Sequence, residues 1–137
     1  MRKIKFRGKR IGNGEWIYGY LVGSSDSLGE ARFITKGPVY QAYGVDPETV
    51  GQYTGMNDKD IEIFEGDVIK VTEDDSVEEY VTTVRYEQGA FVVDVNGEDY
   101  DITGLGWAID IWDNNGDEWE VIGNKWDNPE LLAPNES

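Results

Sequence analysis

Carboxylates are the side chains with which this sequence could do chemistry. The 137 residues include 28 Asp and Glu but neither His nor Cys. This composition excludes the usual general base, a thiolate nucleophile and zinc sites of the cysteine type. Carboxylates alone could bind a hard cation such as Ca²⁺, or act as the acid and base of a hydrolase. We therefore expect a protein that needs no cofactor and is not an enzyme relying on His or Cys.

The first candidate cluster of carboxylates surrounds a predicted hairpin turn. A two-residue turn at Asn96-Gly97 would place Asp94 opposite Asp99. Asp101 would lie on the same face, and three carboxylates together need a cation or a basic partner to offset their repulsion. The spacing of an EF-hand loop is not present, so we expect a solvated acidic face and no metal site.

A second acidic cluster follows an aromatic segment and consists of Asp110, Asp113, Asp117, Glu118 and Glu120. Paired carboxylates beside Trp107, Trp112 and Trp119 could hydrolyse a sugar stacked on the rings. The alternation within Trp107–Trp112 instead indicates a two-sided strand. A turn at Asn115-Gly116 would then pair Trp112 with Trp119 across a hairpin. We expect these rings to fill a core or a strand interface.

The basic residues are concentrated at the N-terminus. Residues 1–10 hold six of the 12 Lys and Arg, whereas residues 11–137 combine six basic with 28 acidic residues, a net charge of -22. So acidic a chain repels nucleic acid and favours basic protein partners or cations.

A basic and aromatic face is predicted for the N-terminal hairpin, formed by Lys5, Arg7, Lys9, Tyr18 and Tyr20. It follows from a two-residue turn at Asn13-Gly14. In that register Lys9 faces Tyr18, and Arg7 faces Tyr20. Cations and stacking rings are the components of a platform for single-stranded nucleic acid. The net charge of -16 weighs against such binding and favours a contact with acidic residues of this chain or a neighbouring subunit.

Short strands separated by Gly-containing turns must position these residues. In the C-terminal half they are predicted at Val68–Thr72, Val81–Tyr86, Ala90–Val95, Tyr100–Ile102, Trp107–Trp112 and Trp119–Ile122. We predict a mainly β fold with an N-terminal hairpin and short-helix region over residues 1–57 and a small antiparallel SH3-like barrel over residues 58–137. The helix, capped by Asp46, is predicted near residues 47–53. One integrated domain remains the alternative to two regions.

Five blocks of this sequence resemble the YopX family, which is known mainly from phages and prophages. These blocks are Ile4–Arg7, Val45–Gly55, Ile63–Ile69, Val121–Asn124 and Asn128–Leu132. They follow the family's order and span nearly the whole chain. The resemblance implies a phage-encoded accessory protein and brings with it no catalytic residues and no established activity.

The sequence as a whole predicts a non-enzymatic protein-interaction module that binds a protein partner and associates with itself. A second hypothesis is an acidic mimic of nucleic acid that occupies a host DNA-binding protein. A third, a carboxylate-dependent hydrolase, requires a concave pocket with two acids and a Trp. Because nowhere do 18 apolar residues follow one another, and no apolar segment follows the basic N-terminus, we expect the host cytoplasm and no membrane contact.

Overall fold

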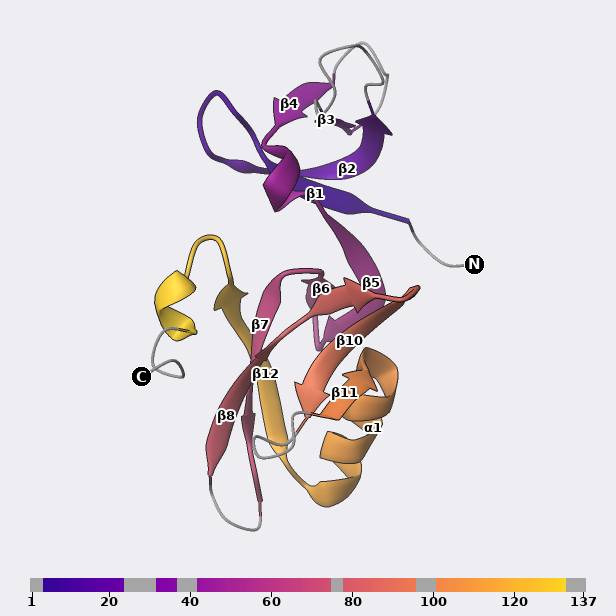
Figure 1. The fold of residues 1–137 in the computed structure, drawn as a ribbon, viewed down its shortest axis with the longest axis vertical. Coiled ribbons are helices and arrows are strands. Elements are labelled where there is room, and N and C mark those ends of the chain that lie inside the picture. The colour runs from indigo at the N-terminus through magenta and orange to yellow at the C-terminus, as the bar shows by residue number, and fades with distance from the viewer. Residues whose placement is uncertain (1–3, 24–31, 37–41, 75–77, 96–100, 133–137) are drawn as a thin grey trace. The chain divides into compact units, whose positions relative to one another are not determined.

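The structure is a computed structural model that describes residues 4–23, 32–36, 42–74, 78–95 and 101–132 of the chain (Figure 1). The chain divides into two compact units, Met1–Gly55 and Met56–Ser137, called unit 1 and unit 2 below. Among the described residues, no helix is long and apolar enough to cross a membrane.

Unit 1 is an antiparallel meander. Its strands are β1 (Phe6–Lys9), β2 (Trp16–Gly23), β3 (Arg32–Thr35) and β4 (Tyr43–Val45), in the order β4-β3-β2-β1. The first residues of β5 (Gly51–Asp58) pair with β1, and β5 then continues into unit 2. Buried Ile17, Ile34 and Val45 form the core of unit 1.

The hairpin β1–β2 differs from its predicted register. Lys9 pairs with Trp16, and Arg7 pairs with Tyr18. The turn therefore contains four residues, with the N–H of Arg10 donating to the carbonyl of Glu15 at 2.8 Å. The prediction of a two-residue turn was wrong because the side chain of Asn13 accepts from the N–H of Glu15 and stabilises the longer turn. An even shift keeps every side chain on its predicted face.

The predicted helix start at Asp46 is confirmed, but the helix is shorter than predicted. A single 3₁₀ turn covers Pro47–Thr49, and the Asp46 carboxylate accepts from the N–H of Glu48 at 3.1 Å. The hydroxyl of Thr49 accepts from the N–H of Lys9 and so holds the turn on β1. Tyr53 lies in β5, because the chain resumes an extended path at Gly51 to pair with β1.

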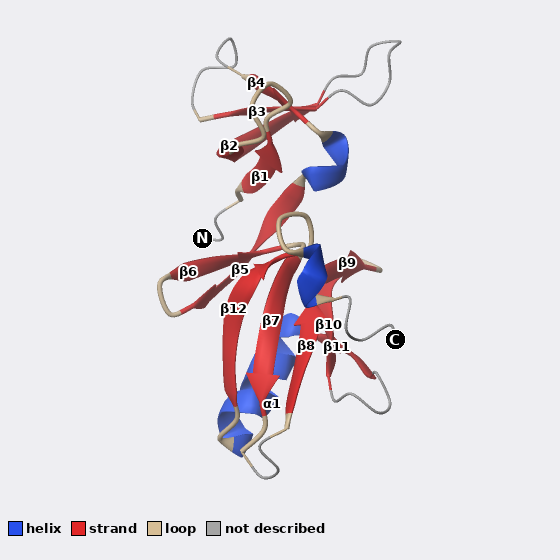
Figure 2. Cartoon of the chain, turned by 90° about the vertical axis from the view of Figure 1, so that its left-hand side faces the viewer, coloured by secondary structure: helices blue, strands red, loops and turns tan. Residues whose placement is uncertain are grey.

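Unit 2 contains two three-stranded antiparallel sheets and one α-helix (Figure 2). The elements are β6 (Ile61–Phe64), β7 (Asp67–Thr72), β8 (Glu79–Thr83), β9 (Arg85–Glu87), β10 (Ala90–Val95), β11 (Asp101–Gly104), α1 (Leu105–Asn115), β12 (Glu118–Asn124) and a 3₁₀ turn at Pro129–Leu131. The sheets have the orders β12-β7-β8 and β11-β10-β9, and β6 pairs with β5. The mainly β prediction is confirmed, whereas the SH3-like barrel is not, because the described sheets do not close.

The segment Trp107–Trp112 was predicted as a strand, and this prediction was wrong. It lies in α1, whose residues Leu105, Ala108 and Trp112 are buried in the core of unit 2. Their spacing of three and four residues is the apolar stripe of a helix. Gly116, predicted as part of a hairpin turn, instead ends α1 in the left-handed conformation with φ 79°.

The register of β10 and β11 also differs from the prediction. Asp94 pairs with Ile102 and not with Asp99, and Val93 pairs with Thr103. The predicted turn at Asn96-Gly97 lies outside the described residues. Because the register differs by an odd number of residues, the side chains of β11 change faces relative to the prediction.

Gly66 allows Trp126 to pack against the turn between β6 and β7. Its φ is 96°, and a Cβ at this position would collide with the Trp126 ring. We expect Gly66→Ala to lower the free energy of unfolding by roughly 2–4 kcal/mol, through the left-handed backbone and the lost space together. Urea denaturation followed by Trp fluorescence measures this change.

Gly89→Ala is the matched control for Gly66→Ala. Gly89 has a φ of 84°, but among the described residues nothing lies within 4 Å of its Cβ position. Only the backbone cost of roughly 1–2 kcal/mol is therefore expected there. Equal losses in the two variants would show that the contact with Trp126 contributes nothing.

Candidate functional site

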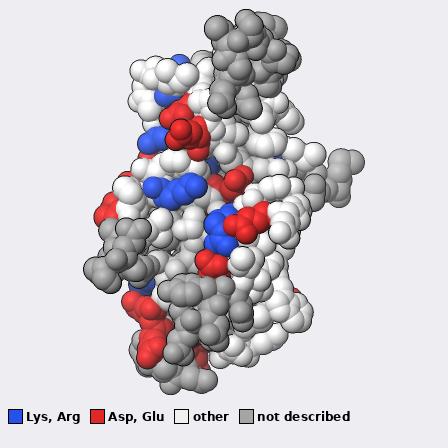
Figure 3. All heavy atoms as spheres, in the orientation of Figure 1, with Lys and Arg blue, Asp and Glu red and all other residues white. Residues whose placement is uncertain are grey.

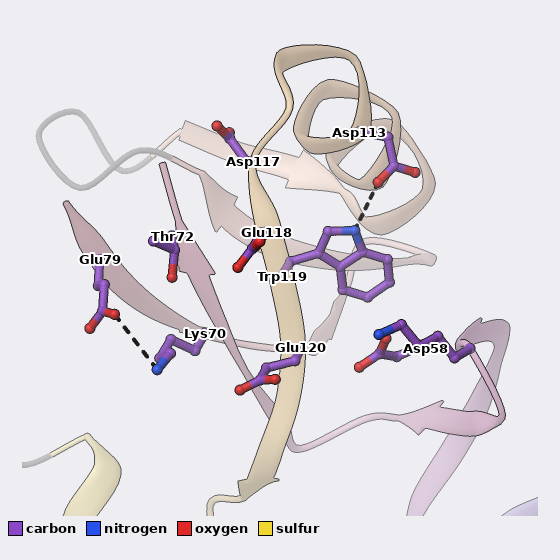
Figure 4. Close-up of a pocket in the computed structure, with 10 residues that line it drawn as sticks. Asp58, Lys70, Thr72, Glu79, Asp113, Asp117, Glu118, Trp119 and Glu120 are labelled. Carbon is purple, nitrogen blue, oxygen red and sulfur yellow. Dashed lines mark hydrogen bonds and ion pairs between the residues drawn. The ribbon is translucent and has the colours of Figure 1, made fainter. Parts of the chain in front are cut away.

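A hollow of about 680 Å³ lies in unit 2 (Figure 4). It is lined by Asp58, Lys59, Lys70, Thr72, Glu79, Asp113, Asp117, Glu118, Trp119 and Glu120. These residues come from β5 and the turn after it, β7, β8, the end of α1, and β12. Six carboxylates against two Lys leave the hollow strongly negative.

Strand β12 supplies the centre of this site. Glu118 pairs with Thr72 and Glu120 with Lys70, so both glutamates project from the solvent side of the sheet β12-β7-β8. Trp119, between them, points to the opposite side and packs against Trp112, with ring centroids 5.7 Å apart. The predicted contact between Trp112 and Trp119 is therefore present. It joins a helix to a strand, whereas the prediction had paired the two residues across a hairpin.

Three of the six carboxylates hold the fold around the hollow. Asp113 accepts from the indole N–H of Trp119 at 3.0 Å (Figure 4). Asp117 accepts from the N–H of Asp74 at 3.0 Å. Asp58, only 6% exposed, accepts from the N–H of Val121 at 3.0 Å. Each of these carboxylates fixes the end or the edge of an element.

The other three carboxylates of the hollow face solvent. Glu79 lies 3.7 Å from the ammonium of Lys70, a pair exposed enough to contribute little to stability. Glu118 and Glu120 are exposed on neighbouring positions of one face of β12. Among the described residues, no group of three or more carboxylates is arranged to hold a metal ion.

The first predicted acidic cluster is not brought together as expected. Asp94 lies opposite Ile102 and is bound by Arg85, whose two terminal nitrogens donate to its carboxylate at 3.0 and 3.2 Å. Asp99 lies outside the described residues, and of Asp101 the structure describes only the backbone. Asp94 is therefore part of an ion pair within the sheet β11-β10-β9.

Arg85 is the positive centre of this ion pair and also donates to Glu87 at 2.9 Å. Partial burial works against its charged form, but the hydrogen bonds and charges of Glu87 and Asp94 outweigh that cost. The pKa of Arg85 is raised above its ordinary value as a result.

On the predicted basic and aromatic face of unit 1, the cations contact a ring that was not predicted, that of Trp16. The guanidinium of Arg7 lies 4.7 Å from the centroid of the Trp16 ring, and the ammonium of Lys9 lies 5.6 Å from it. Arg7 is buried, whereas Tyr18 and Tyr20 are exposed. Arg7 and Lys9, two of the cations that a nucleic acid platform would use, therefore already contact the Trp16 ring. Lys5 lies just before β1.

Trp107 was expected to contribute to a core or a strand interface, but its side chain is 67% exposed. The error follows from the wrong secondary structure, because a helix places Trp107 away from the stripe of Leu105, Ala108 and Trp112. Sequence reasoning grouped five acids around Trp119 but missed Asp58, Lys70 and Glu79 as their neighbours. Strand pairing between distant segments brings these three to the site, and no local pattern indicates it.

The hydrogen bond from Val121 to Asp58 gives a testable consequence for stability. Asp58→Ala should lower the free energy of unfolding by about 1–2 kcal/mol, because a partly buried N–H loses its acceptor. Asp58→Asn retains a side-chain oxygen and should lose less. Chemical denaturation of both variants measures these changes. Equal losses of unfolding free energy in the two variants would show that the missing hydrogen-bond acceptor is not the cause of the destabilisation.

The fold has relatives among solved structures. The crystal structure of protein EF1440 from Enterococcus faecalis has a TM-score of 0.57 at 21% identity and covers 96% of this chain and 99% of its own. The crystal structure of protein yopX from Bacillus subtilis has a TM-score of 0.61 at 22% identity and covers 96% and 97%. At this identity the likeness shows a shared fold.

Sequence comparison agrees with the structural likeness. The SPbeta prophage-derived uncharacterized protein YopX of Bacillus subtilis (strain 168) is 38% identical over 75 residues, 51% of this chain and 49% of that protein. The match thus spans about half the length of this curated relative. A sequence profile described as YopX protein matches residues 5–133, nearly the whole chain. The chain belongs to the YopX family.

Proposed function

We propose that this chain is a phage or prophage accessory protein that acts by binding a basic partner protein and not by catalysis. The proposed binding surface is the acidic hollow of unit 2. One observation carries the proposal: Glu118 and Glu120 stand exposed, side by side, on a strand that borders a hollow with a net excess of four carboxylates. Charge complementarity of this kind selects basic partners and speeds their association.

The two glutamates are available for a partner. Within the described part of the chain, no basic side chain lies at ion-pair distance from either of them. Like charges on one strand face raise the free energy of the isolated protein, and a cationic partner would remove that cost. Binding is thereby favoured even though each exposed ion pair contributes little by itself.

A hydrolase function is less well supported than binding of a basic partner, although the hollow does contain two acids and a Trp. Glycosidases need a carboxylic acid that stays protonated because it is buried in apolar surroundings. Glu118 and Glu120 are exposed, and Asp58 and Asp113 already accept hydrogen bonds that hold β12 and Trp119. These observations support structural or electrostatic roles for the carboxylates of this site.

Mimicry of nucleic acid is also less well supported than binding of a basic partner. It requires carboxylates spaced regularly along one side, as phosphates are along a duplex. On the face drawn in Figure 3, acidic side chains of the described residues lie among basic ones and uncharged surface. Asp94 in particular is held by Arg85.

The proposal is tested by comparing proteins captured from host lysate by the wild-type chain and by the double variant Glu118→Gln with Glu120→Gln. We expect a basic protein that the wild type retains at low salt and loses at high salt, because screening weakens exposed charge pairs. Its affinity for the double variant should fall about tenfold, which corresponds to ~1.4 kcal/mol.

The control for this test is the double variant Asp110→Asn with Glu130→Gln. It removes the same charge from exposed positions that do not line the hollow. If both double variants lose the partner equally, total charge and not the hollow governs binding. If neither loses it, the hollow is not the binding surface and the proposal fails.

A further inference from the structure

Strand β12 is an edge strand, and the hollow reaches both of its sides (Figure 4). Lys70, Thr72 and Glu79 line it over the sheet, whereas Asp58, Asp113 and Trp119 line it beside the outer edge of β12. In the described part of the chain, no strand lies beyond β12 in the sheet β12-β7-β8. The N–H of Val121 donates to Asp58 and therefore points away from β7. Main-chain groups of an antiparallel strand alternate in direction, so Trp119, two residues earlier, also directs its N–H and C=O away from β7. An edge with such groups is a template for another strand.

Asp58 blocks strand pairing at one position of this edge. Its carboxylate accepts from the N–H of Val121. Trp119, two residues earlier, lines the hollow (Figure 4). Proteins commonly cover their edges to prevent unwanted pairing. An edge that is blocked at Val121 and borders a hollow at Trp119 leaves room for a short extended segment.

The charges on β12 decide which segment fits. Residues of an added strand that lie directly across from Glu118 and Glu120 would have their Cβ atoms about 5 Å from those of the glutamates. Lys or Arg at alternate positions would pair with both carboxylates. A second copy of β12 would instead bring its own glutamates toward the same carboxylates, so this edge is unsuited to self-pairing.

We infer that the outer edge of β12 accepts an extended basic segment of the partner as an additional β-strand. The inference rests on the proposed function and adds the mode of recognition. The residue opposite Trp119 exchanges main-chain hydrogen bonds with it, while the flanking Lys or Arg residues face Glu118 and Glu120. The recognised segment thus alternates basic residues with apolar ones, and the apolar ones lie on the same side of the sheet as Trp119.

This geometry predicts which main-chain N–H groups of the segment are needed. Glu118 and Glu120 direct their main-chain groups toward β7, since Trp119 and Val121 direct theirs away. The basic residues opposite the glutamates therefore point their own N–H groups away from β12. The apolar residues between them point their N–H groups toward it.

The test uses the whole chain and a fluorescent, N-acetylated probe peptide of sequence Lys-Val-Lys-Val-Lys-Val-Lys, with affinity measured by anisotropy at low ionic strength. Single N-methylation at the central Val should weaken binding roughly fivefold or more, through loss of a main-chain hydrogen bond. N-methylation at either neighbouring Lys should change affinity less than about twofold, since that N–H points to solvent. A peptide of the same composition with its four Lys contiguous should bind more weakly than the alternating one.

Each outcome supports or overturns a separate step. If N-methylation at Val and at Lys has equal effects, strand addition is overturned, while the proposed function stands as long as Glu118→Gln with Glu120→Gln weakens binding. If that double variant binds the probe as the wild type does, the proposed function fails together with the inference. If the probe does not bind at all, the inference is overturned, and the capture experiment decides the proposed function. If sedimentation shows a dimer that the probe dissociates, the edge belongs to a second copy and the inference is overturned.

Discussion

The antiparallel pairing of β12 with β7 is the constraint on which unit 2 depends. This pairing places Trp119 against Trp112 and thereby fixes the end of α1 over the core. It also determines that Glu118 and Glu120 face solvent beside Lys70 and Thr72. A shift of one residue would exchange the two faces of β12 and bury both glutamates. The core and the acidic site are therefore two consequences of one register.

Charge is divided unequally between the two units. Residues 1–55 contain eight basic and five acidic residues, whereas residues 56–137 contain four basic and 23 acidic ones. A compact unit with so much negative charge is destabilised by self-repulsion. Two of its bases lie where they offset that cost, Arg85 between Glu87 and Asp94 and Lys70 beside Glu79. The carboxylates around Glu118 keep their excess charge, which is a reason to expect function there.

Local signals were correct at several positions where neighbouring residues decide the conformation. Asp46 caps the turn at Pro47 because its carboxylate reaches an N–H two residues ahead. The alternation in β1 and β2 was also correct, although the hairpin turn is two residues longer than predicted. Errors arose where one pattern fits two structures. An Asn-Gly pair after an aromatic segment suits a hairpin turn, yet in Asn115-Gly116 it ends a helix.

From the sequence by itself, composition determined that this chain is rich in carboxylates and lacks His and Cys, and its motifs placed it in the YopX family. The mainly β character was likewise readable, since strand alternation is a local property. The tertiary structure alone decided that α1 is a helix and that Asp58, Lys70 and Glu79 join Glu118 and Glu120 around one hollow. The physical reason is that burial and strand register depend on contacts between distant segments, which short-range patterns do not specify.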